Sequence, residues 1–350
     1  MISKFYGLLP NTLRRIGKRS LYFIHNNQVE KRVLQSDIDR RKKLPFTSIK
    51  DLSNDINIFL PYTEEVHRSN DFYGHASILK KYIRYDPGYQ FKFVIEHGVT
   101  IDNQVVELEK DSPFKAIVVN SNFRANIWRK LNYEASSIGP FIYYSPCLLN
   151  EKQVLKEKER LGKNLLVFPT HSTPDISSSY NVKHFCNEIA RIGKSFDSVR
   201  ICLYWKDIQL GFEEEYKKYG FEVVTAGHVL DPNFLPRLKS IIKCSTSTIA
   251  NDIGSYTGYC IMMGKPHTIL KQELKLNGRK SEIDIIQKGR SARRYRDLLS
   301  AFTTYSNSIT KKQLQYVDYY WGLSEIKTRQ GLKRIVQNAE KVYNKNRKDC

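Results

Sequence analysis

Short apolar segments alternate with amphipathic or charged segments along most of the chain. FKFVIEHG (91–98) and KAIVVNSN (115–122) are apolar enough for buried strands, and FRANIWRKL (123–131) has the spacing of a helix. INIFLPY (56–62) also indicates a strand, and GPFIYY (139–144) indicates a strand or its loop. Strands that alternate with helices are typical of βαβ units and a mostly parallel sheet.

The alternation restarts after a charged, helix-like linker at 150–164 and is clearer in the second half of the chain. The polar run 244–252 is interpreted as a loop that leads into a helix. We expect an α/β fold in which two Rossmann-like domains face each other across a cleft, with helices at the C-terminus. The predicted strands of the second half are 165–172, 199–205, 221–227 and 265–270, and the predicted helices are 182–194, 211–220, 232–243 and 254–264. The expected domains are 1–150 and 151–288, followed by a helical region 289–350 that packs back across the cleft.

Composition adds a charge to this picture. The 350 residues are 41% hydrophobic and 12% aromatic, which is ample for packed cores, and the formal net charge of +21 indicates an anionic partner. Residues 1–43 carry 11 Lys and Arg against 3 acidic residues, with apolar side chains between the charges. Such a segment could lie on an anionic membrane surface, or it could be a solvated helix packed on its own domain.

The six cysteines include no CxxC pair, and most lie in apolar runs. This pattern favours free core thiols in a reducing cytoplasm and gives no sign of a zinc site. No stretch of about 18 apolar residues is present, so we expect a cytoplasmic protein that is soluble or peripheral on the inner face of a bacterial plasma membrane.

Polar residues at the ends of the predicted strands are the first candidates for a site. In an open parallel sheet, ligands bind beyond the carboxyl ends of the strands. Small hydroxyl residues and glycine before a helix can also bind phosphate, because amide groups and the helix dipole favour an anion there. The alternative is that such residues only form caps and turns. The candidates at strand ends are Thr170, His171, Ser172, Trp205, Lys206, Gly227 and His228, and those before the helix are Ser245, Thr246, Ser247, Thr248, Asn251, Gly254, Ser255 and Tyr256.

Three residues are candidates for catalysis. Glu96 and His97 end a strand and precede Gly98, and we expect both to project into the cleft, where a carboxylate beside an imidazole can act as a general base. His171 follows a buried strand and could meet a phosphate. The alternatives are a surface turn at Glu96 and His97 and a loop histidine at His171.

Several segments in this order resemble bacterial glycosyltransferases of the GT-B architecture that build capsule and lipopolysaccharide. The resemblance is to enzymes that use CMP-activated acids such as Kdo and sialic acid, and to the polyol-phosphate transferases of wall teichoic acid. It spans residues 90–270 and is carried by EHG (96–98), GPFIYYSP (139–146), FPTHST (168–173), GHVLDPNFLPRL (227–238) and STSTIANDIGSYTGYCIMMGKP (245–266).

The resemblance implies an inverting transfer from a nucleotide-sugar, with CMP-activated sugars as one option, to a glycan or lipid-linked acceptor. It implies that His171 stabilises the leaving phosphate, that Glu96 or His97 is the base, and that no metal or cofactor is needed. The alternatives are a nucleotide-sugar epimerase, a nucleic-acid-binding protein, which the spread of charge and the lack of a recognition motif disfavour, and a non-catalytic assembly protein. The residues that the resemblance assigns to the donor phosphates are Ser245, Ser247, Thr248 and Ser255.

Overall fold

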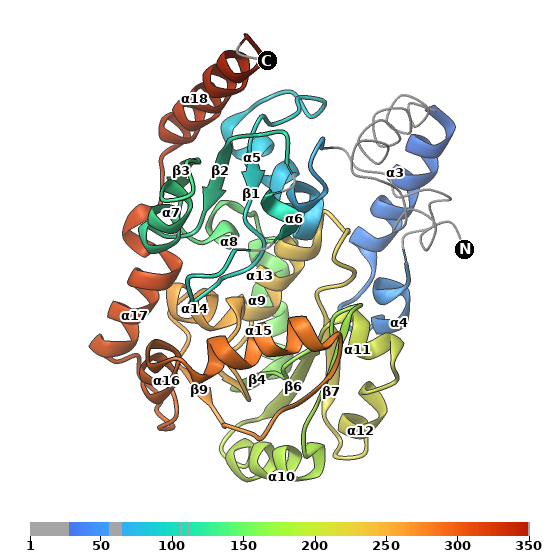
Figure 1. Ribbon diagram of the computed structural model, residues 1–350. Coiled ribbons are helices and arrows are strands. Elements are labelled where there is room, and N and C mark those ends of the chain that lie inside the picture. Colours follow the sequence, from blue (N-terminus) through green and yellow to red (C-terminus); the bar gives the residue numbers. More distant parts are fainter. Residues whose placement is uncertain (1–27, 56–64, 106, 111, 349–350) are drawn as a thin grey trace.

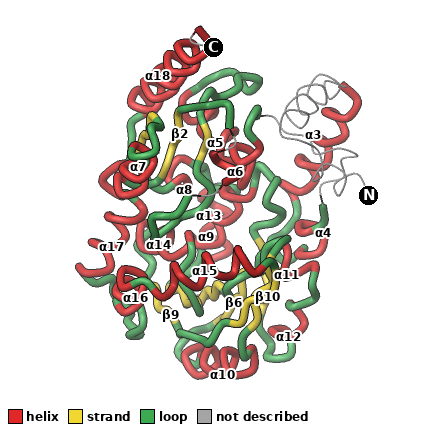
Figure 2. The backbone as a smooth tube through the Cα atoms, in the orientation of Figure 1, coloured by secondary structure: helices red, strands yellow, loops and turns green. Residues whose placement is uncertain are grey.

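The computed structural model describes residues 28–55, 65–105, 107–110 and 112–348. The strand predicted over 56–62 and most of the basic segment 1–43 therefore lie outside the described residues. The described chain is a mixed α/β structure with two separate parallel sheets, and Figure 2 shows their strands as two yellow groups with helices around them.

The first sheet has three short parallel strands in the order β1-β2-β3. The apolar run AIVV forms β2, whose four residues are all buried, and Ser121 caps the helix α7 that follows. The segment 139–144, predicted as a strand or its loop, contains a short helix. The third strand is the polar segment EASS, which the hydrophobic pattern does not reveal. The elements are β1 (Val94–Ile95), β2 (Ala116–Val119), α7 (Asn122–Arg129), β3 (Glu134–Ser137) and α8 (Phe141–Tyr144).

The second sheet has five parallel strands in the order β7-β6-β4-β8-β9. The chain therefore starts in the middle of the sheet, builds outward to one edge, and returns to build the other side from β8. This is the strand order of a Rossmann-like sheet, and its switch point lies between β4 and β8. The strands are β4 (Asn164–Phe168), β6 (Ser198–Leu203), β7 (Glu222–Thr225), β8 (Ser247–Ala250) and β9 (His267–Ile269).

Helices join these strands, as the sequence predicts. The linker forms α9, which begins with a capping box between Asn150 and Gln153 and ends at Gly162. Four of the five strands agree with predicted segments, but β8 forms inside the run that was predicted to be a loop. The helices are α9 (Glu151–Leu161), α10 (Val182–Gly193), α11 (Trp205–Gln209), α12 (Glu213–Lys217), α13 (Phe234–Lys243) and α14 (Ser255–Met262).

The C-terminal helices connect the two sheets. Helix α17 contacts both α14 and α7, and α18 contacts β2 and β3 of the first sheet. Gly258 of α14 lies directly against Trp321 of α17, where an added Cβ would be 2.3 Å from the indole ring. In Figure 1, α15 runs across the molecule below α9 and α14 and just above the labels of β4 and β6. The C-terminal helices are α15 (Lys280–Ser291), α16 (Arg293–Ser300), α17 (Lys311–Trp321), η2 (Leu323–Glu325) and α18 (Arg329–Lys348). Before them, β5 (Ile176–Ser179) pairs with β10 (Lys275–Gly278) in a separate antiparallel sheet.

The N-terminal described residues pack on the second sheet. The amide of Thr225 donates to the carbonyl oxygen of Phe46 (3.1 Å), and the amide of His228 donates to that of Leu52 (2.9 Å). Residues 46–52 therefore run beside β7, although the sequence groups them with the first domain. The elements before β2 are α3 (Gln28–Lys43), α4 (Ile49–Ser53), η1 (Arg68–Gly74), α5 (His75–Ile83) and α6 (Glu107–Lys110).

One core cluster spans both sheets and includes Val118 from β2, Leu166 from β4 and Trp321 from α17. The two sheets are therefore packed together rather than joined only by a linker. In the described part of the chain, no helix is long and apolar enough to cross a membrane.

Candidate functional site

Five aromatic and imidazole side chains meet where the carboxyl ends of the two sheets approach each other. We call them the inter-sheet cluster: Tyr73, His75, His97, His171 and Tyr204. The first three belong to the part of the chain around the first sheet, and the last two follow β4 and β6 of the second sheet. Ligands of parallel α/β sheets bind at this edge, so the cluster is the candidate site.

The first-sheet side of the cluster depends on an unusual backbone. Tyr73 and Gly74 both have left-handed conformations, with φ of 58° and 77°. The amide of Tyr73 donates to the carbonyl oxygen of Val229 (2.6 Å), and a Cβ on Gly74 would lie 2.3 Å from the carbonyl oxygen of Pro232. A non-glycine residue in this region costs about 1–3 kcal/mol. The contact with residues 229–232 therefore holds Tyr73 in a strained conformation at the site.

The contacts within the cluster are close. The Tyr73 ring stacks on the His97 ring at 5.3 Å between centroids and 14° between planes, and it meets His75 edge-on at 5.6 Å. The Tyr73 and Tyr204 hydroxyls are 3.2 Å apart, and the His171 ring lies 4.3 Å from the Tyr204 ring. His97 and His171, which the sequence predicts to share a site, are thus linked through two tyrosines.

The imidazoles of the cluster are neutral at neutral pH. Burial lowers the pKa of His97 to about 4, and burial followed by the nearby His97 lowers the pKa of His171 to about 4 and that of His75 to about 3. The Nδ1 atoms of His75 and His97 are buried and have no hydrogen-bond partner among the described residues. Buried polar atoms are usually paired, so these atoms are candidates to bind a ligand.

The switch point of the second sheet lies beside the cluster. The Asn251 side-chain oxygen accepts from the amide of Thr170 (2.6 Å), which ties the loop after β4 to the loop after β8. The Asn251 Nδ2 is buried without a partner in the described chain. Ser255 begins α14, and its hydroxyl is 4.0 Å from the position of a Cβ on Gly98, next to His97.

The structure places the predicted residues Thr170, Asn251, Gly254, Ser255 and Tyr256 at this switch point, around the start of α14. One face of the Tyr256 ring is not free to contact a ligand, because it stacks on Phe168 at 4.8 Å between centroids and 5° between planes.

The structure does not bring Ser245, Thr246, Ser247 and Thr248, which were predicted to contact phosphate, to the switch point. These residues lie before β8 or in its first half, whereas the switch point lies beyond the carboxyl end of the strand. The hydroxyls of Ser247 and Thr248 donate to the carbonyl oxygen of Pro266 (3.3 and 3.0 Å), and that of Ser245 donates to Ile242 (2.8 Å). Their hydrogen bonds therefore join the elements around β8.

Glu96 does not share the environment of His97. It is buried and accepts from Arg124 Nε and Nη2 (2.9 and 2.5 Å) and from Trp128 Nε1 (2.7 Å). Neighbouring residues of an extended chain point to opposite faces, so the two side chains cannot both reach the cluster. Glu96 therefore anchors α7 to β1, and the structure does not bring it into the cluster as the prediction of a base requires.

Gly227 and His228 are also structural. A Cβ on Gly227, at a φ of 94°, would lie 2.7 Å from an Arg237 nitrogen. The His228 ring packs 4.3 Å from Trp205 and lies 3.4 Å from Asp55, and burial lowers its pKa to about 4. His228 therefore packs against Trp205 and against Asp55 of the N-terminal residues.

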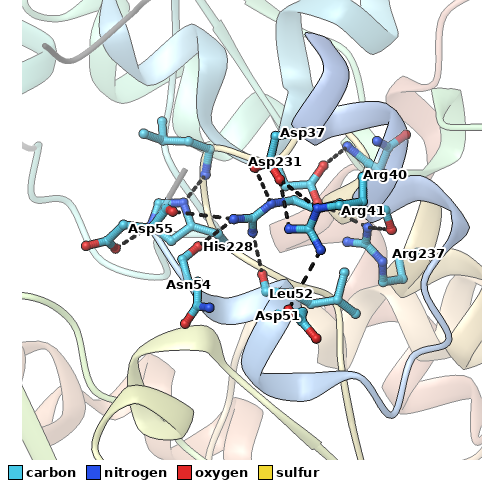
Figure 3. Close-up of polar contacts among 12 residues, drawn as sticks. Asp37, Arg40, Arg41, Asp51, Leu52, Asn54, Asp55, His228, Asp231 and Arg237 are labelled. Atoms are coloured by element: carbon cyan, nitrogen blue, oxygen red, sulfur yellow. Dashed lines mark hydrogen bonds and ion pairs between the residues drawn. The ribbon is translucent and has the colours of Figure 1, made fainter. Parts of the chain in front are cut away.

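The same region buries one charge of the basic segment. Arg41 of α3 is 2% exposed; it pairs with Asp37 (2.7 Å) and donates to the carbonyl oxygen of Leu52 (3.1 Å). Beside it, the buried Arg237 pairs with Asp231 (3.1 Å), as Figure 3 shows. The Arg41 side chain therefore attaches α3 to residues 52–55, and its burial makes it unavailable to a membrane surface.

Ser172 is buried and has a structural position as well. Its amide donates to Asp207 (3.0 Å), and its hydroxyl accepts from the amide of Ser178 (3.1 Å). Burial raises the pKa of Asp207 to about 6. These bonds fix the loop that carries His171.

Sequence reasoning missed four residues around the site: Tyr73, His75, Tyr204 and Arg290. Tyr204 immediately follows β6, so the rule that found His171 could also have found it. Tyr73 and His75 lie in helical segments and reach the site only through tertiary contacts. Arg290 pairs with Asp252 in the switch-point loop (2.5 Å) and comes from a helix distant in sequence.

No family model matches the chain, and no curated protein matches it. Among solved structures, the chain is similar to Phytolacca americana UGT2 in complex with UDP-2fluoro-glucose and pterostilbene. The identity is 11% and the TM-score 0.25, over 69% of this chain and 52% of that chain, so the chain spans about half the length of that protein. The description of the fold therefore rests on the strand order and contacts given above.

Proposed function

We propose that this protein is a glycosyltransferase that moves a sugar from a nucleotide-sugar to an acceptor hydroxyl. The observation that carries the proposal is the meeting of His97 and His171 from two parallel sheets, at the carboxyl edge of each. In this arrangement, one sheet can hold an acceptor and the switch point of the other can hold a phosphorylated donor.

The donor phosphate is assigned to the start of α14. The first amides of a helix and its dipole attract an anion, and Ser255 and the unpartnered Asn251 Nδ2 add side-chain donors. His171, which is neutral, has one ring N–H that can donate to a departing phosphate oxygen.

His97 is assigned as the general base, because a neutral imidazole has a ring nitrogen that can accept a proton. The acceptor proton moves to His97 while the acceptor oxygen bonds to the anomeric carbon. The bond from that carbon to the phosphate oxygen breaks on the opposite side, and the phosphate leaves with the electron pair. The product has inverted configuration.

The finer parts of the proposal are a CMP-activated donor, a capsular or lipopolysaccharide acceptor, and work at the inner membrane surface. Their support is the resemblance of motif order and the basic composition of residues 1–43. An epimerase is the competing enzyme, and it differs in consuming the nucleotide-sugar without an acceptor.

Thermal stabilisation by nucleotides tests the proposal. CMP, CDP, UDP and GDP are added separately to the full chain, and one of them should raise the melting temperature, because a ligand that binds only the native state stabilises it. Absence of a shift with all four, together with a shift on added DNA or RNA, would transfer the assignment to nucleic-acid binding.

The roles of the histidines are tested with the donor so identified. His97→Ala should lower turnover by about 10²- to 10⁴-fold, as expected for loss of a general base. His184→Ala is the matched control, since this histidine lies at the start of α10 and is exposed. Full turnover in His97→Ala and His171→Ala would contradict the site.

A further inference from the structure

A second concave site lies outside the inter-sheet cluster, between α7 and α17. It is a recess of about 340 Å³ lined by Phe123 and Asn126 of α7, by Lys130 directly after α7, and by Asp318 and Tyr319 of α17, with Asn103 also in its lining. The mechanism proposed above uses none of these residues.

The recess has an aromatic surface that faces solvent. Tyr319 is 57% exposed, although its ring is held by Phe123 (5.4 Å between centroids) and by the perpendicular ring of Tyr320 (4.8 Å). A held aromatic ring loses little conformational entropy when a ligand packs on it. The C–H groups on one face of a sugar ring pack well on such a surface.

Three polar side chains of the recess, Asn103, Asn126 and Asp318, are each held by one hydrogen bond through one oxygen, and each keeps a second polar atom available to a ligand. The Asn126 oxygen accepts from Arg129 (2.9 Å) and the Asn103 oxygen accepts from Arg294 (2.7 Å), and neither amide nitrogen has a partner among the described residues. One oxygen of Asp318 accepts from the amide of Ser324 (2.7 Å), which leaves the other oxygen available. Donors and acceptors in fixed positions are what recognition of hydroxyl groups requires.

The charge of the recess indicates which class of ligand it binds. One lysine, Lys130, and two carboxylates, Asp318 and Glu325, line it, whereas the chain as a whole carries a formal charge of +21. An anion would have stronger partners elsewhere on such a basic protein. The lining therefore favours a neutral, hydroxyl-rich ligand.

The recess also lies on the same sheet edge as His97. The Asn120 side chain donates to the carbonyl oxygen of Gly98 (3.0 Å), beside His97, and α7 begins two residues later at Asn122. From these observations, we propose that the recess binds a neutral oligosaccharide, held by stacking on Tyr319 and by hydrogen bonds to Asn126 and Asp318. The further identification of this oligosaccharide as the acceptor chain rests on the proposed function.

Calorimetric titration of the full chain with maltohexaose, cellohexaose and chitohexaose tests this site. At least one should bind, and Tyr319→Ala and Asn126→Ala should each weaken that binding by about tenfold or more. Tyr305→Ala is the matched control because Tyr305 is an exposed tyrosine outside the recess, and it should bind as the wild type does. Failure of all three probes to bind the wild type, or unchanged affinity in Tyr319→Ala, would overturn the assignment.

The thermal shift that nucleotides cause distinguishes the oligosaccharide-site proposal from the glycosyltransferase proposal. Tyr319→Ala should keep the wild-type thermal response to nucleotide, because Tyr319 is not part of the switch point. Oligosaccharide binding without any nucleotide response would contradict the proposed function and leave the recess assignment standing.

Discussion

Replacement of Glu96 by alanine distinguishes an anchor from a catalytic base. Glu96 is 1% exposed and is the only carboxylate paired with Arg124 in the described chain. It also accepts from Trp128, so it holds two side chains of α7 against β1. In Glu96→Ala, the Arg124 guanidinium would stay buried with its charge uncompensated.

The magnitude follows from this burial. Removing one partner of a buried ion pair costs about 3–5 kcal/mol, because the other charge remains desolvated. About 1 kcal/mol shifts the melting temperature of a domain of this size by roughly 2–4 °C, so the expected decrease is roughly 6–20 °C. Glu134→Ala is the control on the same sheet, and it should cost within about 0.5 kcal/mol because Glu134 is exposed.

The assay is thermal and urea unfolding of Glu96→Ala, Glu134→Ala and the double variant Glu96→Ala/Arg124→Met. The double variant should recover part of the lost stability, since it removes the uncompensated charge. Full recovery is not expected, because Arg124 also donates to the carbonyl oxygens of Asp102 (2.7 Å) and Gln104 (2.8 Å). Wild-type stability in Glu96→Ala, combined with lost turnover, would refute the reasoning and restore Glu96 as a base.

Acid should destabilise the protein. Burial lowers the pKa of His75 and of His267 to about 3 in the folded chain, below the unfolded value of about 6.5. The stabilising contribution of these two histidines is therefore present above about pH 6.5 and is lost as the pH falls toward about 3. Melting temperatures measured from pH 8 to pH 4 should therefore be level at first and fall below about pH 6.5, and a level profile throughout would contradict the assigned burial. Gly258→Ala should lower the melting temperature, because the new Cβ would lie 2.3 Å from the Trp321 ring, and Gly258→Ala/Trp321→Leu should recover part of that loss in the same measurement. Gly74→Ala should disturb the site through its φ of 77° and its close contact with Pro232, and retention of both full turnover and nucleotide response would show that the strained turn is dispensable.

The second sheet was predictable because its strands carry a simple signal. Runs such as LLVF in β4 are buried on both faces and read as continuous apolar segments between helices. The exception is β8, where STIA begins with two hydroxyl residues and resembles a loop. Its hydroxyls bond to the carbonyl oxygen of Pro266, a tertiary contact that the local sequence does not reveal.

The site was predictable only in part, and for two different reasons. His97 and His171 follow strands, so the rule for parallel sheets finds them. Glu96 was expected to project into the cleft together with His97, but the period of a strand sends adjacent side chains to opposite faces. Tyr73 could not be found at all, because its position depends on a left-handed backbone that residues 229–232 impose.

Residues 46–52, which run beside β7, have a consequence for the solubility of the protein. β7 is the outer strand of the second sheet, and an uncovered outer strand offers free amides and carbonyls to other molecules. Here the carbonyl oxygen of Phe46 accepts from Thr225, and at the other margin that of Phe302 accepts from Ile269 (2.7 Å) in β9. Both margins are thus occupied by segments distant in sequence. A fragment that begins after residue 55 would keep every strand of the sheet but lose one cover, and self-association through β7 would follow.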